Sequence, residues 1–253
     1  MLRIKNLKKR FNIGTDFEKV IFDGLDLEFK ENTATAIIGP NGCGKSTLMN
    51  LIAGSLTPDC GIIEIDGEDI TKLSERERSK FFGRVYQDPS KSVSPSLSIL
   101  ENMALADNKN KHFGLGKLVD LKKVDYYKSL ISQLNLGLEN MLSSKVSLLS
   151  GGQRQSLSLI MASMKKPKLL LLDEHTASLD PKTSHVVMNK TKALIEDKNI
   201  STIMVSHNMK DAYEYSDRVI MLKDGEIVLD ELTENLVLKD LEDLYKTTEE
   251  IVC

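Results

Sequence analysis

A glycine-rich run near the N-terminus carries the clearest chemistry in the sequence. It is Gly39-Pro40-Asn41-Gly42-Cys43-Gly44-Lys45-Ser46-Thr47 and fits the pattern G-x-x-x-x-G-K-[ST]. Glycines let the backbone approach an anion, and successive N–H groups at the start of a following helix form a concavity that attracts it. Lys45 adds a mobile cation for the β- and γ-phosphates, and the Ser46 hydroxyl can ligate Mg²⁺. The run therefore predicts a site for ATP with Mg²⁺.

Two consecutive carboxylates follow an apolar run later in the chain. Four leucines, residues 169–172, precede Asp173 and Glu174. In parallel α/β sheets, ligands bind beyond the C-terminal ends of the strands, where these acids would lie. We expect Asp173 to hold Mg²⁺, directly or through water, and Glu174 to orient and deprotonate the attacking water. Together with the glycine-rich run, this pair predicts ATP hydrolysis.

The elements that must position these residues indicate an α/β fold. An apolar run at 35–38 precedes the glycine-rich run, and 45–53 has helical spacing with Gly54 as a C-cap. Asp23-Gly24 is typical of a turn. Alternation of strands and helices predicts a parallel sheet with crossover helices. Further strands are expected at 2–7, 20–29, 61–66, 83–87, 168–173, 200–206 and 218–222, and helices at 74–81, 97–105, 124–136, 181–195 and 209–215.

The order of these elements suggests how the chain is divided. We expect one domain over 1–253, with a nucleotide-binding core at 1–87 and 166–230 and a helical subdomain at 88–165. A polar, basic loop is expected at 107–123. The acidic segment 231–253 has leucines near helical spacing and predicts a short packed helix.

Composition limits the possible functions. The chain has 253 residues, a formal net charge of -3 and 28% charged residues, so it lacks the surplus of Lys and Arg expected of a nucleic-acid-coating protein. Cys43, Cys60 and Cys253 are too few and too unevenly spaced for a disulfide framework, and a reducing compartment fits better. No apolar run approaches the roughly 20 residues of a spanning helix.

A further motif resembles a known family. Leu149-Ser150-Gly151-Gly152-Gln153-Arg154-Gln155 is similar to the signature of ATP-binding cassette proteins and precedes the leucine-rich strand, as in that family. The other family motifs follow its order to about residue 230. Gln87 resembles the Q-loop glutamine, Ser178-Leu179-Asp180 the D-loop, and His207 the switch histidine. Phe11 occupies the place of the aromatic residue that stacks on adenine, with Phe17 as a competitor.

The resemblance implies a fold and a composite site. The fold is a P-loop NTPase parallel-sheet core with an N-terminal antiparallel β subdomain and an inserted α-helical subdomain. Ser150 can cap the following helix and, with Gly151, Gly152 and Gln153, grip the γ-phosphate held by a second copy. Two chains would then sandwich two ATP molecules, with Asp180 in the D-loop beside them. Gln87 would contact Mg²⁺ and water, and His207 would sense the γ-phosphate.

The same resemblance implies partners and a location. The chain would be the motor subunit of a transporter, peripheral on the cytoplasmic face of the cell membrane. It would form a homodimer and dock to an integral permease, with an extracytoplasmic solute-binding protein in the complex and no nucleic acid. The runs 83–89 and 173–181 are similar to those of bacterial uptake ATPases for amino acids or other small solutes, and aromatic amino acids are our guess.

Four questions stay open from the sequence. The family usually has proline after its catalytic glutamate, whereas this chain has His175, either a subgroup variation or a source of pH dependence. Cys43 is either filler or a thiol whose modification blocks nucleotide binding. The basic stretch 109–123 is either a solvated face or a contact with the permease or lipid headgroups. The rival functions are a cassette ATPase driving mechanical signalling or lipid handling, and a soluble one acting in translation or DNA maintenance.

Overall fold

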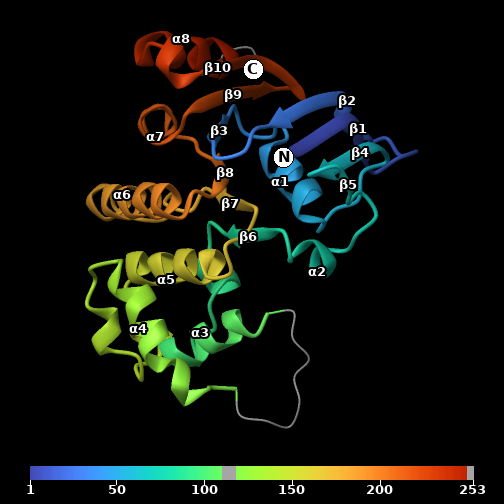
Figure 1. Cartoon of the computed structure of the whole chain (residues 1–253). Helices are drawn as coiled ribbons and strands as arrows, with labels where there is room; N and C mark the ends of the chain where they lie inside the picture. Colours follow the sequence, from blue (N-terminus) through green and yellow to red (C-terminus); the bar gives the residue numbers. More distant parts are fainter. Residues whose placement is uncertain (110–117, 250–253) are drawn as a thin grey trace. The chain divides into compact units, whose positions relative to one another are not determined.

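The computed structural model describes residues 1–109 and 118–249 (Figure 1). The chain divides into two compact units. The first unit comprises Met1–Lys80 with Ser201–Cys253, and the second comprises Phe81–Ile200. The first holds the glycine-rich run and His207, and the second holds Gln87, the signature run and the acidic pair. The boundaries expected for the nucleotide-binding core and the helical subdomain stay predictions.

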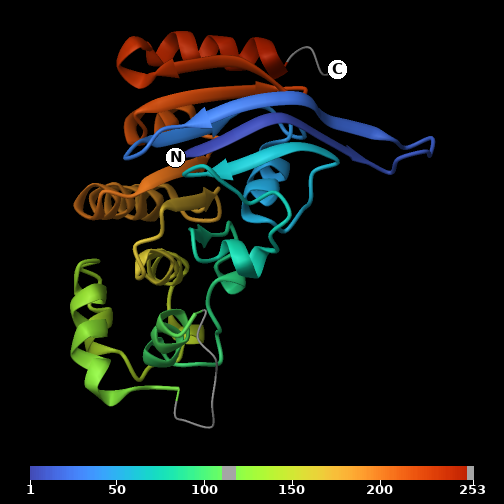
Figure 2. The same ribbon diagram turned by 45° about the vertical axis from the view of Figure 1, so that its right-hand side comes forward.

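An antiparallel sheet forms the N-terminal part of the first unit. Its strand order is β2 (Lys19–Phe29), β1 (Leu2–Phe11), β4 (Cys60–Ile65) and β5 (Glu68–Asp69). Alternate apolar side chains along β1 and β2 are buried, as expected for a sheet with one covered face. Figure 2 shows the blue hairpin of β1 and β2 extending past β4. This confirms the antiparallel β subdomain.

The turn predicted at Asp23-Gly24 is wrong, because β2 runs through both residues. Leu25 pairs with Leu7 while Asp23 pairs with Lys8, so Gly24 has no partner across the ladder. Its φ of 102° suits only glycine without strain. The Asp-Gly pair marks a β-bulge instead of a chain reversal.

A second set of strands in the first unit carries the glycine-rich run. Strand β3 (Ala34–Ile38) lies between β8 (Ser201–Val205) and β9 (Arg218–Lys223) and is parallel to both. All three are nearly continuous apolar runs, as strands covered on both faces must be. Helix α1 (Lys45–Ala53) follows β3, and α7 (Met209–Tyr215) connects β8 to β9. The bounds of both match the predicted helices.

The C-terminal segment begins with a strand that the sequence analysis missed. Strand β10 (Glu226–Leu232) pairs antiparallel with β9 through a two-residue turn at Asp224 and Gly225, both at positive φ. Helix α8 (Leu238–Glu249) follows, so the helix predicted within 231–253 is present but begins later. None of the seven side chains of β10 is buried, and three consecutive apolar residues at 227–229 obscure the period of two in its sequence.

A buried arginine fixes the end of the helix that follows the glycine-rich run. Arg78 is the last residue of the short helix α2 (Glu75–Arg78), and its side chain is 1% exposed. Its guanidinium donates to the carbonyl oxygens of Leu51 and Ile52 at 2.6 and 2.9 Å, and to those of Thr71 and Leu73. Since the last carbonyls of a helix have no partners within it, Arg78 caps α1 from outside.

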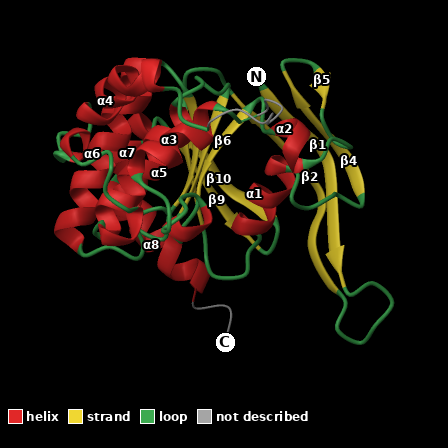
Figure 3. Ribbon diagram, turned by 90° about the horizontal axis from the view of Figure 1, so that it is seen from below, coloured by secondary structure: helices red, strands yellow, loops and turns green. Residues whose placement is uncertain are grey.

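The second unit contains one parallel strand pair and four of the eight α-helices found in the described residues, and Figure 3 labels all four. Strand β6 (Phe82–Val85) pairs with β7 (Leu169–Asp173). Between them in sequence come α3 (Ile99–Asp107), α4 (Val124–Ser132) and α5 (Gly151–Ser163), and α6 (Pro181–Lys198) follows β7. The predicted loop at 107–123 lies partly outside the described residues, which resume before a 3₁₀ turn at Leu121–Lys123.

The length and the apolar character of the described helices determine whether any of them could cross a membrane. None of those within 1–109 and 118–249 combines the length and the apolar character that spanning a bilayer requires.

Candidate functional site

The phosphate loop, defined as Gly39 to Thr47, joins the end of β3 to the start of α1. Its three glycines all have positive φ. Gly39 passes against β9 so closely that an added Cβ would lie 2.1 Å from the carbonyl oxygen of Leu222. A side chain at this position would push the loop off the sheet, so the sequence requirement for glycine has a steric cause.

The loop already surrounds a cation. Lys45 is 5% exposed, and its Nζ donates to the carbonyl oxygens of Gly39 and Pro40 at 2.6 and 3.0 Å. The Sγ atom of Cys43 lies 3.9 Å from the same nitrogen. In this arrangement the ammonium group of Lys45 donates its hydrogen bonds to backbone oxygens of the loop. A phosphate would have to compete with these oxygens for the ammonium group.

The C-terminal helix also reaches this loop. The hydroxyl of Tyr245 in α8 donates to the carbonyl oxygen of Gly39 over 3.4 Å, the same oxygen that Lys45 contacts. Leu241 anchors α8 and is 1% exposed. Nothing in the local sequence could have predicted this contact, because the two residues are 206 positions apart.

The environment of Cys43 favours the interpretation of this residue as filler. Its side chain is 4% exposed, and burial raises the pKa of the thiol. Because the thiolate is the reactive form, we expect maleimide at pH 7 to label the exposed Cys60 at least ~10-fold faster than Cys43. Mass spectrometry of the labelled peptides over time would measure both rates. Equal rates would show that the loop exposes its thiol and would revive the alternative of a reactive cysteine.

His207 lies at the same sheet edge as the phosphate loop. Val205 at the end of β8 pairs with Ile37 in β3, and the amide of Ser206 donates to the carbonyl oxygen of Ile37 at 3.2 Å. The next residue is His207, which is exposed. Asn208 then caps α7. The first unit thus brings the loop and the histidine together, as the parallel strands predict.

Two aromatic residues were candidates for adenine stacking. Phe11 is the last residue of β1, is half-buried, and has the Nζ of Lys9 at 5.4 Å from its ring centroid. Phe17 lies in the connection between β1 and β2 with 80% of its surface exposed. Phe11 is therefore held on a strand with a cation over its ring, whereas Phe17 projects from a loop.

The second unit collects the acidic pair and Gln87 at one strand edge. Val85 pairs with Leu172, so Asp173 at the end of β7 and Gln87 just after β6 lie where these neighbouring parallel strands end. Glu174 comes next, with a positive φ of 46° that is unusual for a residue with a side chain. This arrangement confirms the strand-end placement expected from the sequence.

Arg84 is a partner of Asp173 that the sequence analysis missed. Its Nη2 lies 3.2 Å from Oδ2 of Asp173, and its guanidinium carbon lies 4.4 Å from the ring centroid of Tyr86. The side chains of the pair are 11% and 16% exposed. The alternation of side chains along β6 and β7 could have suggested this contact, since Arg84 pairs in register with Leu171.

The Arg84–Asp173 ion pair makes a stability prediction. Removing one partner of a fully buried ion pair lowers stability by about 3–5 kcal/mol, whereas removing one partner of an exposed pair changes stability little. Because this pair is slightly exposed, we expect Arg84→Met to lower the free energy of unfolding by about 1–3 kcal/mol. Urea denaturation without nucleotide would measure it. Arg3→Met, which breaks the exposed pair with Glu28, is the matched control and should change little. Equal losses of unfolding free energy in Arg84→Met and Arg3→Met would show that the Arg84–Asp173 pair does not stabilise the fold more than an exposed pair.

Ser150 caps the signature helix α5, as predicted. Its Oγ accepts from the amide of Gln153 at 3.2 Å, and Oε1 of Gln153 accepts from the amide of Ser150 at 3.0 Å. These reciprocal bonds form a capping box. Nε2 of the buried Gln155 donates to the carbonyl oxygen of Tyr86 at 3.0 Å, one residue before Gln87. The signature helix is therefore bonded to the backbone that leads into Gln87.

The segment after Glu174 leads into α6. The carboxylate of Asp180 caps this helix by accepting from the amide of Thr183 at 3.1 Å. His175 lies at the start of the segment and is 2% exposed, with Nε2 3.2 Å from Oγ1 of Thr191. Desolvation by burial lowers the pKa of His175 to about 4.

The buried histidine predicts a pH dependence of stability. The unfolded chain binds a proton at His175 below about pH 6.5, but the folded chain binds it only below about pH 4. Stability therefore falls as the pH drops from 6.5 towards 4, by at most about 1.4 kcal/mol per pH unit from this residue. Denaturation of the wild type and His175→Leu between pH 7 and 5 would measure it, and the variant should show the shallower slope. Parallel profiles would contradict the low pKa.

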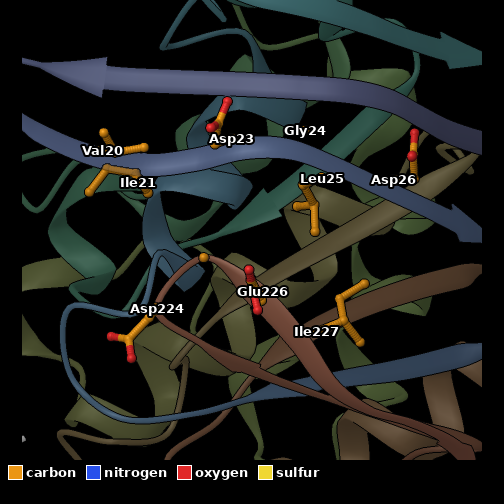
Figure 4. A pocket seen from close by; sticks show the side chains of 10 residues that line it. Val20, Ile21, Asp23, Gly24, Leu25, Asp26, Asp224, Glu226 and Ile227 are labelled. Carbon is orange, nitrogen blue, oxygen red and sulfur yellow. The ribbon is translucent and has the colours of Figure 1, made fainter.

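A cavity of about 350 Å³ lies elsewhere in the first unit (Figure 4). It is bordered by β2 and by the turn between β9 and β10, and four of its lining residues are Asp23, Asp26, Asp224 and Glu226. Asp23 pairs with Lys8 at 2.7 Å, and Asp26 accepts from a backbone amide. None of the residues predicted to bind ATP lines it, and its carboxylates would repel phosphates.

Comparisons with known proteins point to one family. The ABC transporter family model matches residues 22–177, more than half of the chain. The tyrosine transport ATP-binding protein of Clostridioides difficile (strain R20291) is 46% identical, covering 100% of this chain and 97% of that protein. The phosphonates import ATP-binding protein PhnC 1 of Ruegeria sp. (strain TM1040) is 32% identical, covering 97% and 94%. A solved dimeric ATP-binding cassette in a post-hydrolysis state with ADP and Pi is 28% identical, with a TM-score of 0.78, covering 93% of this chain and 100% of that one.

Proposed function

This chain belongs to the ABC transporter family, and on that basis we propose the roles of its residues, its partners and its cargo. It is an ATP hydrolase and the ATP-binding subunit of an importer. The observation that carries the proposal is the capped signature helix in the same chain as a phosphate loop that encloses Lys45. A triphosphate site alone would fit many enzymes, whereas the signature helix offers a second phosphate-binding edge.

We infer that the first unit binds the nucleotide. The backbone amides of the phosphate loop and the start of α1 would cradle the phosphates, with the remaining loop residues Pro40, Asn41, Gly42, Cys43 and Thr47 shaping the turn. Lys45 would exchange its carbonyl partners for the β- and γ-phosphates. Phe11 would stack on adenine, and His207 would contact the γ-phosphate from the neighbouring strand end.

The residues present fit a magnesium ion. Within the described parts of the chain, no three His, Cys, Asp or Glu side chains cluster so as to hold a metal. Mg²⁺ needs no such cluster, because it usually takes one or two protein oxygens with phosphate and water oxygens. Asp173, the Ser46 hydroxyl and the Gln87 amide would supply them. When bound, Mg²⁺ neutralises charge on the phosphates.

The second unit would supply the hydrolytic groups. Glu174 would accept the proton of the attacking water and orient it towards the γ-phosphate. Gln87 would contact the same water. Gln155 bonds the signature helix to the residue before Gln87. A displacement of the signature helix would therefore displace Gln87, and a displacement of Gln87 would displace the helix.

We propose that two copies of the chain close over two ATP molecules. The exposed Ser150, together with Gly151 and Gly152, would contact the γ-phosphate bound by the partner copy, where the positive end of α5 favours an anion. Gln153 and Asp180 would border that nucleotide. A related cassette whose solved structure is a dimer with ADP and Pi supports this arrangement.

The partners follow from the role in import. We propose that the chain docks peripherally to an integral permease on the cytoplasmic face of the membrane, and that an extracytoplasmic solute-binding protein delivers the cargo. Tyrosine or another aromatic amino acid is the proposed solute, supported by the 46% identity to a tyrosine transport ATP-binding protein.

Reconstitution tests the proposal. The chain would be purified with its native permease, placed in lipid vesicles with the binding protein, and assayed for ATP turnover with tyrosine, phenylalanine, phosphonate or spermidine. We expect tyrosine or phenylalanine to stimulate turnover and the other two to leave it unchanged. Stimulation by phosphonate or spermidine alone would overturn the cargo, and an absence of ATP turnover would overturn the whole proposal.

A further inference from the structure

His175 stands where the family usually has proline, directly after the proposed general base. The side chain is 2% exposed, and its ring makes a polar contact with Thr191 in α6, which is 3% exposed. A polar ring that is buried this completely costs free energy unless it forms a hydrogen bond. The contact to Thr191 therefore determines where the ring lies.

The direction of this hydrogen bond follows from its neighbours. The hydroxyl of Thr191 donates its single hydrogen to the carbonyl oxygen of Val187, one turn earlier in α6, at 2.9 Å. Towards His175, Oγ1 of Thr191 can then only accept. With the Thr191 hydroxyl bonded to Val187 in this way, the arrangement assigns the hydrogen to Nε2 of His175, which then donates over 3.2 Å as the neutral Nε2–H tautomer.

The backbone beside this ring is unusual. Glu174 has a φ of 46°, and a residue with a side chain keeps this conformation only when its surroundings impose it. The amide of Ala177 donates to the carbonyl oxygen of Glu174 at 3.0 Å and closes a turn over His175. The imidazole thus fastens this turn to the middle of α6, and the carboxylate of Asp180, three residues after the turn, caps the start of the same helix.

We propose that His175 is a positioning residue: its hydrogen bond to Thr191 holds the turn that sets the direction of the Glu174 carboxylate. Proline restrains a chain covalently through its fixed φ, whereas this chain uses a buried side chain tied to α6. The proposal rests on the role of Glu174 as general base. It predicts that Thr191, which touches no nucleotide in the proposed site, affects hydrolysis as much as His175 does.

Two matched pairs of variants test the hydrogen bond. His175→Leu removes the donor, whereas His175→Gln keeps an N–H at a similar reach. Thr191→Val removes the acceptor at nearly constant shape, whereas Thr191→Ser keeps it. We expect the Leu and Val variants to lower kcat about tenfold with the KM for ATP within about twofold, since a small misplacement of a catalytic group is costly. The Gln and Ser variants should retain most of the wild-type kcat.

The double variant His175→Leu/Thr191→Val and a parallel Glu174→Gln complete the design. If one hydrogen bond carries the effect, the double variant should be no slower than the slower single variant. A fall in thermal stability with kcat unchanged in Thr191→Val would show a merely structural contact and overturn the proposal. So would equal losses in the Val and Ser variants. If Glu174→Gln itself kept its turnover, the proposed general base would fail instead, and the two failures can be told apart.

Discussion

Glu174→Gln is expected to lower steady-state ATP turnover by about 100-fold or more while leaving ATP affinity within about twofold. The amide keeps the size of the side chain at the end of β7 but can no longer accept a proton from water. Binding should persist, because the phosphate loop and Lys45 belong to the other unit. Turnover with a coupled phosphate assay and affinity with a fluorescent ATP analogue would measure the two effects.

A matched acid provides the control for this experiment. Glu68→Gln makes the same chemical change on the exposed strand β5, where Glu68 pairs with Lys80. Its turnover should equal that of the wild type. Near-normal turnover in Glu174→Gln would place the general base elsewhere, and loss of ATP binding in that variant would mean that Glu174 holds the nucleotide instead of the water.

Lys45→Met is expected to weaken ATP binding by roughly 10- to 100-fold. Hydrogen bonds to charged groups contribute about 1.5–3 kcal/mol, and about 1.4 kcal/mol corresponds to a factor of ten in affinity. Methionine has a similar length and leaves the loop without its cation. Isothermal titration with ATP would give the affinity directly.

Adenosine distinguishes the cause of this loss. Because it lacks phosphates, its weak binding should be the same in wild type and Lys45→Met if the loop keeps its shape. Lys30→Met removes an exposed lysine and controls for net charge. Unchanged ATP affinity in Lys45→Met would contradict the role of this lysine, and an equal loss for adenosine would mean that the loop had collapsed.

Local signals predicted most of the elements that hold the site. Short sequence patterns of a few residues identified three features: the loop glycines, the helix caps Ser150 and Gly54, and the acids at the strand end. Strand β10 was missed because its side chains are largely exposed and show weak alternation. Gly24 was misread because an Asp-Gly pair is favoured both in turns and at positions of positive φ within a bulged strand.

The contacts between distant segments could not be predicted in this way. Gln155 reaches Tyr86, and Tyr245 reaches Gly39, only because the strands and helices bring them together. The contact between Arg84 and Asp173 differs, because the alternation along β6 and β7 could have suggested it. His175 shows the same limit as Gln155 and Tyr245. The sequence analysis could identify the missing proline, but the partner Thr191 lies on another element, and the deep burial that lowers the pKa of the histidine exists only in the folded chain.

Light scattering of Glu174→Gln with ATP and Mg²⁺ tests the central claim of the composite site most directly. We predict a dimer with ATP and a monomer with ADP, because only the triphosphate offers a γ-phosphate to the Ser150 edge of the partner copy. Adding Ser150→Phe to this variant should prevent association without weakening ATP binding. The account would be contradicted by a protein that stays monomeric at every protein concentration with saturating ATP. It would also be contradicted by a dimer that forms equally with ATP and ADP and persists in the Ser150→Phe variant.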